Sequence, residues 1–211
     1  MILPPEDETA NPRARIQGVE TLADDWFILR RYTLQLLRHD GDIQKFSRLS
    51  VECGDRASAL LYSRSRGTVL LTDQFRLPAF LHGDPSGALF EVPGGLVGER
   101  AAHEAARREV EEEAGYRVKR LDHLATVYLS PQLSAERTHL FAGEYSPEDR
   151  VGAGGGIAEE GEDNKVFELS LDRAVSLVLQ QPAADAKTLL LLFMAKSLGL
   201  LTGPPGPSGR L

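Results

Sequence analysis

The sequence predicts an α+β fold, in which a mixed β-sheet lies between helices as an α/β/α sandwich and a small β lobe precedes it. Strand-like segments outnumber helical ones and do not alternate with them strictly, which argues against a purely parallel sheet. The 211 residues are 42% hydrophobic and 26% charged. That composition is typical of a globular chain with a substantial core.

The first predicted elements are strands. Residues 26–37 carry aromatic and aliphatic side chains at mostly alternating positions, and the polar turn 39–42 leads into a returning strand at 43–51. These segments predict a hairpin-like N-terminal lobe. A second pair of strands follows at 57–62 and 68–75.

The clearest helix spans residues 101–114, which are rich in Ala, Glu and Arg and are followed by Gly115. After it we expect strands at 118–129 and 138–145, followed by a loop rich in Gly and Glu at 152–164. A short strand at 166–169 and helices at 171–179 and 184–198 complete the predicted elements.

These elements divide the chain into four parts. We expect a flexible N-terminus at 1–20, an N-terminal β lobe at 21–55, the main domain at 56–201 and a disordered tail at 202–211. The tail is dominated by Gly and Pro, which disfavour a packed core.

Charge and composition exclude several kinds of partner. The net charge is −7 with no basic stripe, so a nucleic-acid partner is not expected. The apolar stretch 189–195 is far shorter than the ~20 residues of a membrane span. The single cysteine, Cys53, rules out a disulfide within the chain and fits a cytoplasmic protein, in which we expect this thiol to be structural.

The end of the helix at 101–114 carries an unusual cluster of acids. At about 100° per residue, Glu109, Glu112 and Glu113 share one face, whereas Glu111 points to the other side. Each close pair of like charges costs about 0.2–0.5 kcal/mol, and the negative end of the helix dipole adds to the repulsion. A hard divalent cation such as Mg²⁺ or Mn²⁺ would offset both effects.

The alternative is a solvated helix face without a ligand. The pairs Glu104–Arg108 and Arg107–Glu111 have the i,i+4 spacing of surface ion pairs. These pairs leave the acids of the last turn unexplained.

The run from Arg108 to Tyr116 resembles the second half of the signature of the Nudix hydrolase family. That half reads Arg-Glu, an apolar residue, any residue, Glu-Glu, any residue, Gly and an apolar residue. The first half of the signature reads Gly, five residues, Glu and seven residues before the Arg-Glu pair. This chain departs from it, because the position expected to hold Glu, counted back from Arg108, is occupied by Arg100. Gly94 takes the expected Gly, whereas Gly95 would leave the segment one residue short.

The resemblance extends to the branch that contains ADP-ribose and GDP-mannose pyrophosphatases. Pro131 lies sixteen residues after Gly115, a spacing associated with ADP-ribose pyrophosphatases, although Gln132 replaces the glycine expected next. The other segments similar to this branch are 73–76, 91–95, 135–137 and 154–163.

The resemblance implies a site made of three groups of residues. The metal group is Gly94, through its carbonyl, with Glu109, Glu112, Glu113 and Glu162. The catalytic group is Glu160 as general base, with Glu162 and Arg108. The substrate group is Arg76, Pro131, Glu136 and Arg137. Two alternatives stay open. The loop that carries Glu160 and Glu162 could be an acidic surface loop without a catalytic role, and Arg76 could form a surface ion pair and not bind substrate.

The implied function is that of a Mg²⁺- or Mn²⁺-dependent pyrophosphatase. It would hydrolyse ADP-ribose or a related nucleoside diphosphate sugar to a nucleoside monophosphate and a sugar phosphate. Alternatives are a preference for GDP-mannose and a catalytically weak ligand sensor with the same fold. The N-terminal lobe is similar to the lobe through which this branch forms homodimers.

Overall fold

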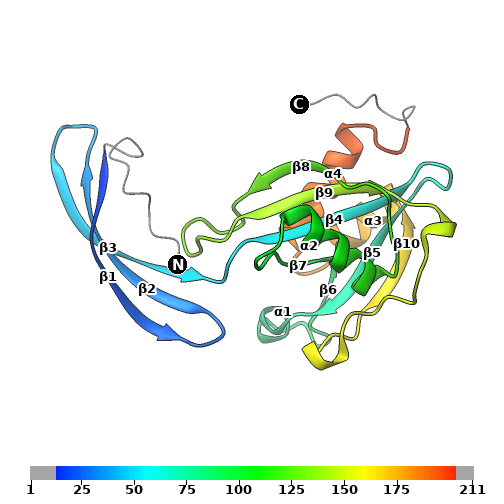
Figure 1. The fold of residues 1–211 in the computed structure, drawn as a ribbon, viewed down its shortest axis with the longest axis horizontal. Helices are drawn as coiled ribbons and strands as arrows, with labels where there is room; N and C mark the ends of the chain where they lie inside the picture. The colour runs from blue at the N-terminus through cyan, green and yellow to red at the C-terminus, as the bar shows by residue number, and fades with distance from the viewer. Residues whose placement is uncertain (1–12, 203–211) are drawn as a thin grey trace. The chain divides into compact units, whose positions relative to one another are not determined.

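The structure, a computed structural model, describes residues 13–202, apart from the side chain of Glu160. The chain forms two compact units (Figure 1): residues 13–54 with the segment Ser130–Glu136, and residues 55–129 with 137–202. No helix in this described part is both long and apolar enough to cross a membrane. The expectations for 1–12 and 203–211 fall outside the described residues.

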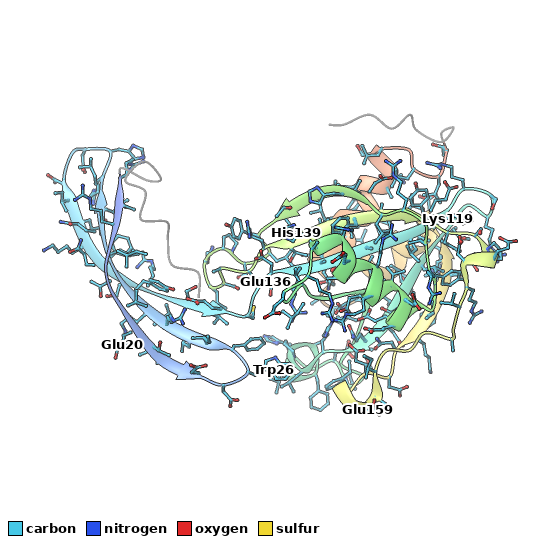
Figure 2. The ribbon with its side chains drawn as sticks, in the orientation of Figure 1. Glu20, Trp26, Lys119, Glu136, His139 and Glu159 are labelled. Atoms are coloured by element: carbon cyan, nitrogen blue, oxygen red, sulfur yellow. The ribbon has the colours of Figure 1, made fainter. Side chains whose placement is uncertain are left out.

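The N-terminal unit is an antiparallel three-stranded sheet. Its strands are β1 (Ala14–Asp24), β2 (Ile28–Leu37) and β3 (Ile43–Glu52), in the order β1-β2-β3. Several large apolar side chains of this sheet are exposed, above all Trp26 in the β1–β2 turn at 80% (Figure 2). The unit therefore presents an apolar surface in the isolated chain.

Strand β1 corrects the expectation that residues up to 20 are flexible. It begins at Ala14 and pairs with β2 along its whole length, so the lobe has three strands and is larger than a hairpin. Its register shifts between Ile16 and Gly18, and again between Thr21 and Ala23. Such irregularities interrupt the alternation of apolar and polar residues, which is why the sequence pattern did not reveal the strand.

The second unit contains a mixed seven-stranded sheet with the order β10-β5-β4-β9-β8, in which β6 pairs with β5 and β7 pairs with β4. Only β4 and β9 run parallel. The strands are β4 (Arg56–Ser63), β5 (Thr68–Phe75), β6 (Ala88–Glu91), β7 (Gly94–Leu96), β8 (Asp122–Val127), β9 (Thr138–Glu144) and β10 (Lys165–Ser170).

Helices cover both faces of this sheet (Figure 1), which confirms the predicted α/β/α sandwich. Alternate residues of β4 belong to different cores: Ala59 packs with Val110 on one face, and Leu60 packs with Leu191 on the other. The helices are α1 (Leu77–Leu81), α2 (Ala102–Glu109), α3 (Leu171–Leu179) and α4 (Ala186–Ser197). The sequence pattern did not predict the short helix α1.

Helix α2 does not continue as an α-helix to residue 114. From Val110 to Ala114 it is a π-helical segment, η1, which ends at Gly115. A π-helical turn inside a helix frequently marks a functional site.

The end of η1 is joined to the glycine-rich loop by backbone hydrogen bonds. The amides of Gly155 and Gly156 donate to the carbonyls of Glu113 and Glu112, at 2.9 and 3.1 Å. Gly115 has a φ of 78°, and a Cβ there would lie 2.5 Å from the carbonyl oxygen of Gly152. The helix end and the loop therefore need a glycine at this position.

We expect Gly115→Ala to destabilise the protein by more than ~2 kcal/mol, because it adds a backbone clash to the ~1 kcal/mol cost of a left-handed alanine. Urea unfolding would measure the loss. Gly67→Ala is the matched control, since Gly67 has a φ of 68° but nothing within 4 Å of the added Cβ. Equal losses in the two variants would contradict the close approach at Gly115.

Candidate active site

Two acids of the run from Arg108 to Tyr116 are buried where α2 passes into η1. Glu109 is 6% exposed and Glu113 is 1% exposed. Glu112 is half-buried, and Glu111 turns outward to form an ion pair with Arg117. The structure therefore places Glu109 and Glu113 inward and Glu111 outward, whereas Glu112, expected on the same face as the buried pair, is only half-buried.

Strand β7 faces these acids with two glycines. The amide of Gly94 donates to Oε2 of Glu113 at 3.3 Å. A Cβ on Gly95 would lie 2.5 Å from Oε1 of Glu109, and one on Gly94 would lie 2.1 Å from the hydroxyl of Ser58 on β4. Both positions need glycine, because the buried carboxylates and the neighbouring strand approach the backbone too closely for a side chain.

The electrostatics at Glu113 oppose a negative charge there. Burial, followed by the nearby carboxylates Glu162 and Glu109, raises the pKa of Glu113 from 4.5 to about 8. Its Oε1 is buried and has no hydrogen-bond partner among the residues that the structure describes. An unpaired buried carboxylate oxygen among other acids is the kind of group that a cation would stabilise.

The described acids do not form a preorganised metal-binding site. Within residues 13–202, no group of three or more His, Cys, Asp or Glu side chains is positioned to hold a metal ion. One reason is Arg108, which bonds Glu109 and lies 3.3 Å from Glu112. Arg108 thus contacts two of the acids that it was predicted to orient.

The glycine-rich loop brings one of its predicted acids to the site. Oε2 of Glu162 accepts the amide of Ile157 at 2.9 Å, and its Oε1 accepts Nε2 of Gln74 at 3.3 Å. Glu159, labelled in Figure 2, is exposed on the short 3₁₀ turn Ala158–Glu160. The side chain of Glu160 lies outside the described part of the structure, so its predicted role stays a prediction.

Arg76 lies in a buried charge cluster that the sequence analysis did not identify. It bonds both oxygens of Glu91, at 2.7 and 2.9 Å, and Glu91 is also paired with Lys187. Burial alone would raise the pKa of Glu91, but the charges of Lys187 and Arg76 outweigh it and lower the pKa to about 2. The available sequence signal was a lysine in the first turn of α4, two residues after Asp185 and just before the apolar run 189–195.

The other predicted substrate residues belong to different units. Pro131 and Glu136 lie in the segment that packs with the N-terminal sheet, where the thiol of Cys53 donates to Glu136 at 3.0 Å. Arg137 lies in the second unit, and its Nη2 is 2.6 Å from Oδ2 of Asp55. Contact of these residues with a substrate stays a prediction.

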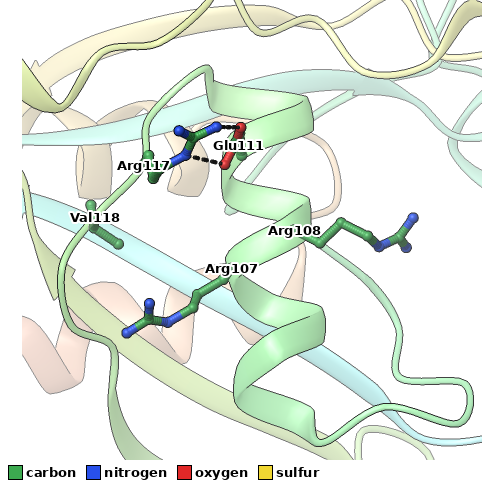
Figure 3. A pocket seen from close by; sticks show the side chains of 5 residues that line it. All are labelled: Arg107, Arg108, Glu111, Arg117 and Val118. Atoms are coloured by element: carbon green, nitrogen blue, oxygen red, sulfur yellow. Dashed lines mark hydrogen bonds and ion pairs between the residues drawn. The ribbon is translucent and has the colours of Figure 1, made fainter.

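A surface pocket of about 220 Å³ lies beside α2. It is lined by Arg107, Arg108, Glu111, Arg117 and Val118. In Figure 3 Glu111 and Arg117 form an ion pair, while Arg108 extends from the opposite side of the helix to Arg107. The arginines Arg107 and Arg117 make this side of the helix basic, in contrast to the acidic inner side.

Comparisons with known proteins identify the family of the chain. Residues 54–192 match the family model described as NUDIX domain, and residues 13–49 match that of the GDP-mannose pyrophosphatase NudK N-terminal domain. A GDP-mannose pyrophosphatase of Pectobacterium atrosepticum is 40% identical over 171 residues, which cover 81% of this chain and 88% of the relative. A GDP-mannose pyrophosphatase of Citrobacter koseri is 38% identical over 182 residues, covering 86% and 94%.

Solved structures show the same fold. The crystal structure of an ADP compounds hydrolase matches with a TM-score of 0.65 at 19% identity, covering 90% of this chain and 97% of that one. The family match spans well over half of the chain and includes the acids Glu109 and Glu113. The chain therefore belongs to the Nudix hydrolase family.

Proposed function

We propose that this Nudix hydrolase is a divalent-metal-dependent pyrophosphatase that cleaves nucleoside diphosphate sugars to a nucleoside monophosphate and a sugar phosphate. The observation that carries the proposal is the pair of buried acids Glu109 and Glu113 against the glycines of β7. Within the described part of the chain, Oε1 of Glu113 has no hydrogen-bond partner. An acidic pocket of this kind would repel a diphosphate unless cations were bound with it.

Nudix hydrolases generally use divalent metal ions. In this chain we propose Mg²⁺ or Mn²⁺, held by Glu109, Glu112, Glu113, Glu162 and the carbonyl of Gly94. A bound cation would supply Lewis acidity toward the phosphates and would make water easier to deprotonate. For Glu109 and Glu112 to take part, Arg108 would have to release them.

The remaining proposed roles belong to side chains of the chain itself. Glu160, on the 3₁₀ turn of the loop, would accept the proton of the attacking water. Arg76 uses Nε and Nη2 to hold Glu91 and Gln74, and its Nη1 makes no hydrogen bond within the described residues. That nitrogen is suited to a phosphate oxygen of the substrate.

The relatives favour GDP-mannose as the substrate to test first. Both are named GDP-mannose pyrophosphatases, and the N-terminal unit matches the domain of such an enzyme. ADP-ribose is the second candidate, because the spacing from Gly115 to Pro131 is the one associated with its pyrophosphatases. The named hydrolase of ADP compounds supports the fold alone.

A substrate panel tests the proposal. GDP-mannose, ADP-ribose, UDP-glucose and a dinucleoside polyphosphate would be incubated with the protein in Mg²⁺, Mn²⁺ or EDTA. We expect a nucleoside monophosphate and a sugar phosphate from at least one nucleotide sugar, and no product in EDTA. Tight binding without hydrolysis under every condition would favour the ligand-sensor alternative instead.

Two further proposals concern the state of the protein. The exposed apolar residues of the N-terminal sheet, including Trp26 and Ile43, fit a homodimer, which light scattering on the purified protein would test. The single cysteine of the chain, Cys53, has no second cysteine to pair with in the same chain, which fits a reducing cytoplasm.

A further inference from the structure

A chain of buried polar contacts runs from helix α4 toward the catalytic loop. It begins at Lys187, which is 9% exposed and bonds Glu91 and, at 3.0 Å, Asp185. Glu91 ends strand β6 and bonds the guanidinium of Arg76 through both of its oxygens. The position of Arg76 is therefore set by Glu91, which is itself held by Lys187.

Gln74 continues this chain, and its orientation is dictated by its neighbours. Gln74 is 6% exposed, and its Oε1 accepts a hydrogen bond from Nη2 of Arg76. An arginine can only donate, so the amide oxygen must face Arg76 and the amide nitrogen must face the other way. That nitrogen donates to Oε1 of Glu162 at 3.3 Å.

The loop is shaped to receive this contact. Glu162 folds back over Gly156, where a Cβ would lie 2.3 Å from Oε2 of Glu162. The same oxygen, Oε2, accepts a hydrogen bond from the backbone amide of Ile157. A glycine and two donors thus hold this one carboxylate, although its neighbours Gly161 and Asp163 are exposed.

We propose that Gln74 is a positioning residue: it is held by the Lys187–Glu91–Arg76 cluster and in turn holds the carboxylate of Glu162 in place. This inference rests on the proposed metal role of Glu162. The cluster would hold the loop carboxylate in front of the buried acids before substrate arrives. Hydrogen bonds to ligating carboxylates are typically worth 10–100-fold in metal affinity or activity.

Two variants separate positioning from packing. Gln74→Leu removes both hydrogen bonds, whereas Gln74→Glu keeps an acceptor for Arg76, removes the donor to Glu162 and places a negative charge beside it. We expect kcat to fall by about 10–100-fold in both, with KM changed much less. A purely structural role predicts that Gln74→Glu remains active, since its bond to the cluster is kept.

Two readouts do not depend on activity. Hydrogen exchange of residues 155–164 should become faster in both variants, because Glu162 no longer has its side-chain donor. Mn²⁺ affinity, measured by electron paramagnetic resonance without substrate, should fall by about tenfold or more. Gln181→Leu is the matched control, because Gln181 also bonds through both ends of its amide, to the backbone of Phe90 and Ala88.

The outcomes distinguish this inference from the proposed function. Unchanged loop exchange and Mn²⁺ affinity in Gln74→Glu would overturn the positioning role, whatever the substrate. Equal effects from Gln181→Leu would also overturn it, since general loss of a structural glutamine would then suffice. Faster exchange and weaker Mn²⁺ binding in a protein that hydrolyses no nucleotide sugar would support the inference and defeat the proposed function.

Discussion

Glu113→Gln is expected to lower kcat/KM by about 10³-fold while leaving the fold intact. A bound cation contributes several kcal/mol of transition-state stabilisation, and each 1.36 kcal/mol corresponds to tenfold in rate. Glutamine has nearly the same shape as glutamate, so the buried position stays filled, but the charge that would hold the cation is lost. Steady-state kinetics on the preferred nucleotide sugar in Mg²⁺ would measure the loss.

The same variant should behave differently when no metal is present. Burial and the neighbouring acids raise the pKa of Glu113 to about 8 in the folded protein, from the 4.5 of an ordinary glutamate. A raised carboxyl pKa favours folding below about pH 4.5, and this contribution is lost as the pH rises toward 8. In EDTA, wild-type stability should therefore fall over this range more steeply than that of Glu113→Gln, as urea unfolding would show.

Glu111→Gln provides the control on the same helix. Glu111 points away from the buried acids and is paired with Arg117 at the surface. It should retain activity and should follow the wild-type dependence of stability on pH in EDTA. If Glu113→Gln kept wild-type turnover, or if both variants lost activity equally, the assignment of the metal site would fail.

The acids of the site could be predicted because their signal is local. Glu109 and Glu113 lie four residues apart, so helix geometry alone places them on one face, and Gly94 precedes them at a fixed spacing. The strand 57–62 was predictable for a similar reason, since β4 is buried on both faces and residues 57–62 are apolar except at Ser58.

Features that depend on long-range pairing could not be predicted. Glu91 and Lys187 are 96 residues apart, and each looks like a surface charge in its own segment. Only the packing of α4 near the end of β6 makes them partners. The association of Ser130–Glu136 with the N-terminal sheet, through a bridge between Ser134 and Val51, is equally invisible in a local pattern.

The π-helical segment is a third case. The composition of 101–114 favours a helix throughout, and no residue there breaks an α-helix. The wider turn appears where Glu112 and Glu113 accept amides from the glycine loop, far along the sequence. Tertiary contacts therefore decide the local geometry at the position where the chemistry is proposed.

Glu91→Leu should cost about 3–5 kcal/mol of stability, more than any other single substitution considered. The side chain of Glu91 is 3% exposed and lies between Lys187 and Arg76. Removing it leaves two cations close together without their shared anion, and such uncompensated buried charge is strongly destabilising. Its pKa of about 2, against 4.5 for a free glutamate, indicates a contribution of about 3 kcal/mol, in agreement with that range.

The pH dependence of this contribution has the opposite sign to that of Glu113. A depressed carboxyl pKa stabilises the fold above about pH 4.5, and the stabilisation is lost as the pH falls toward 2. Urea unfolding in EDTA at pH 7 and pH 3 should therefore show a smaller difference between wild type and Glu91→Leu at the lower pH. A difference that stayed constant would mean that packing, and not charge, accounts for the loss.

The double variant Glu91→Leu/Lys187→Met isolates the electrostatic part. Lys187→Met alone leaves Glu91 paired with Arg76, so its loss should be smaller than that of Glu91→Leu. In the double variant only one cation is left without its anion, so the loss of stability should be smaller than the sum of the two single losses by ~1 kcal/mol or more. Strict additivity would show that Lys187 and Glu91 do not interact in solution, and the cluster could then not serve as the anchor of Gln74.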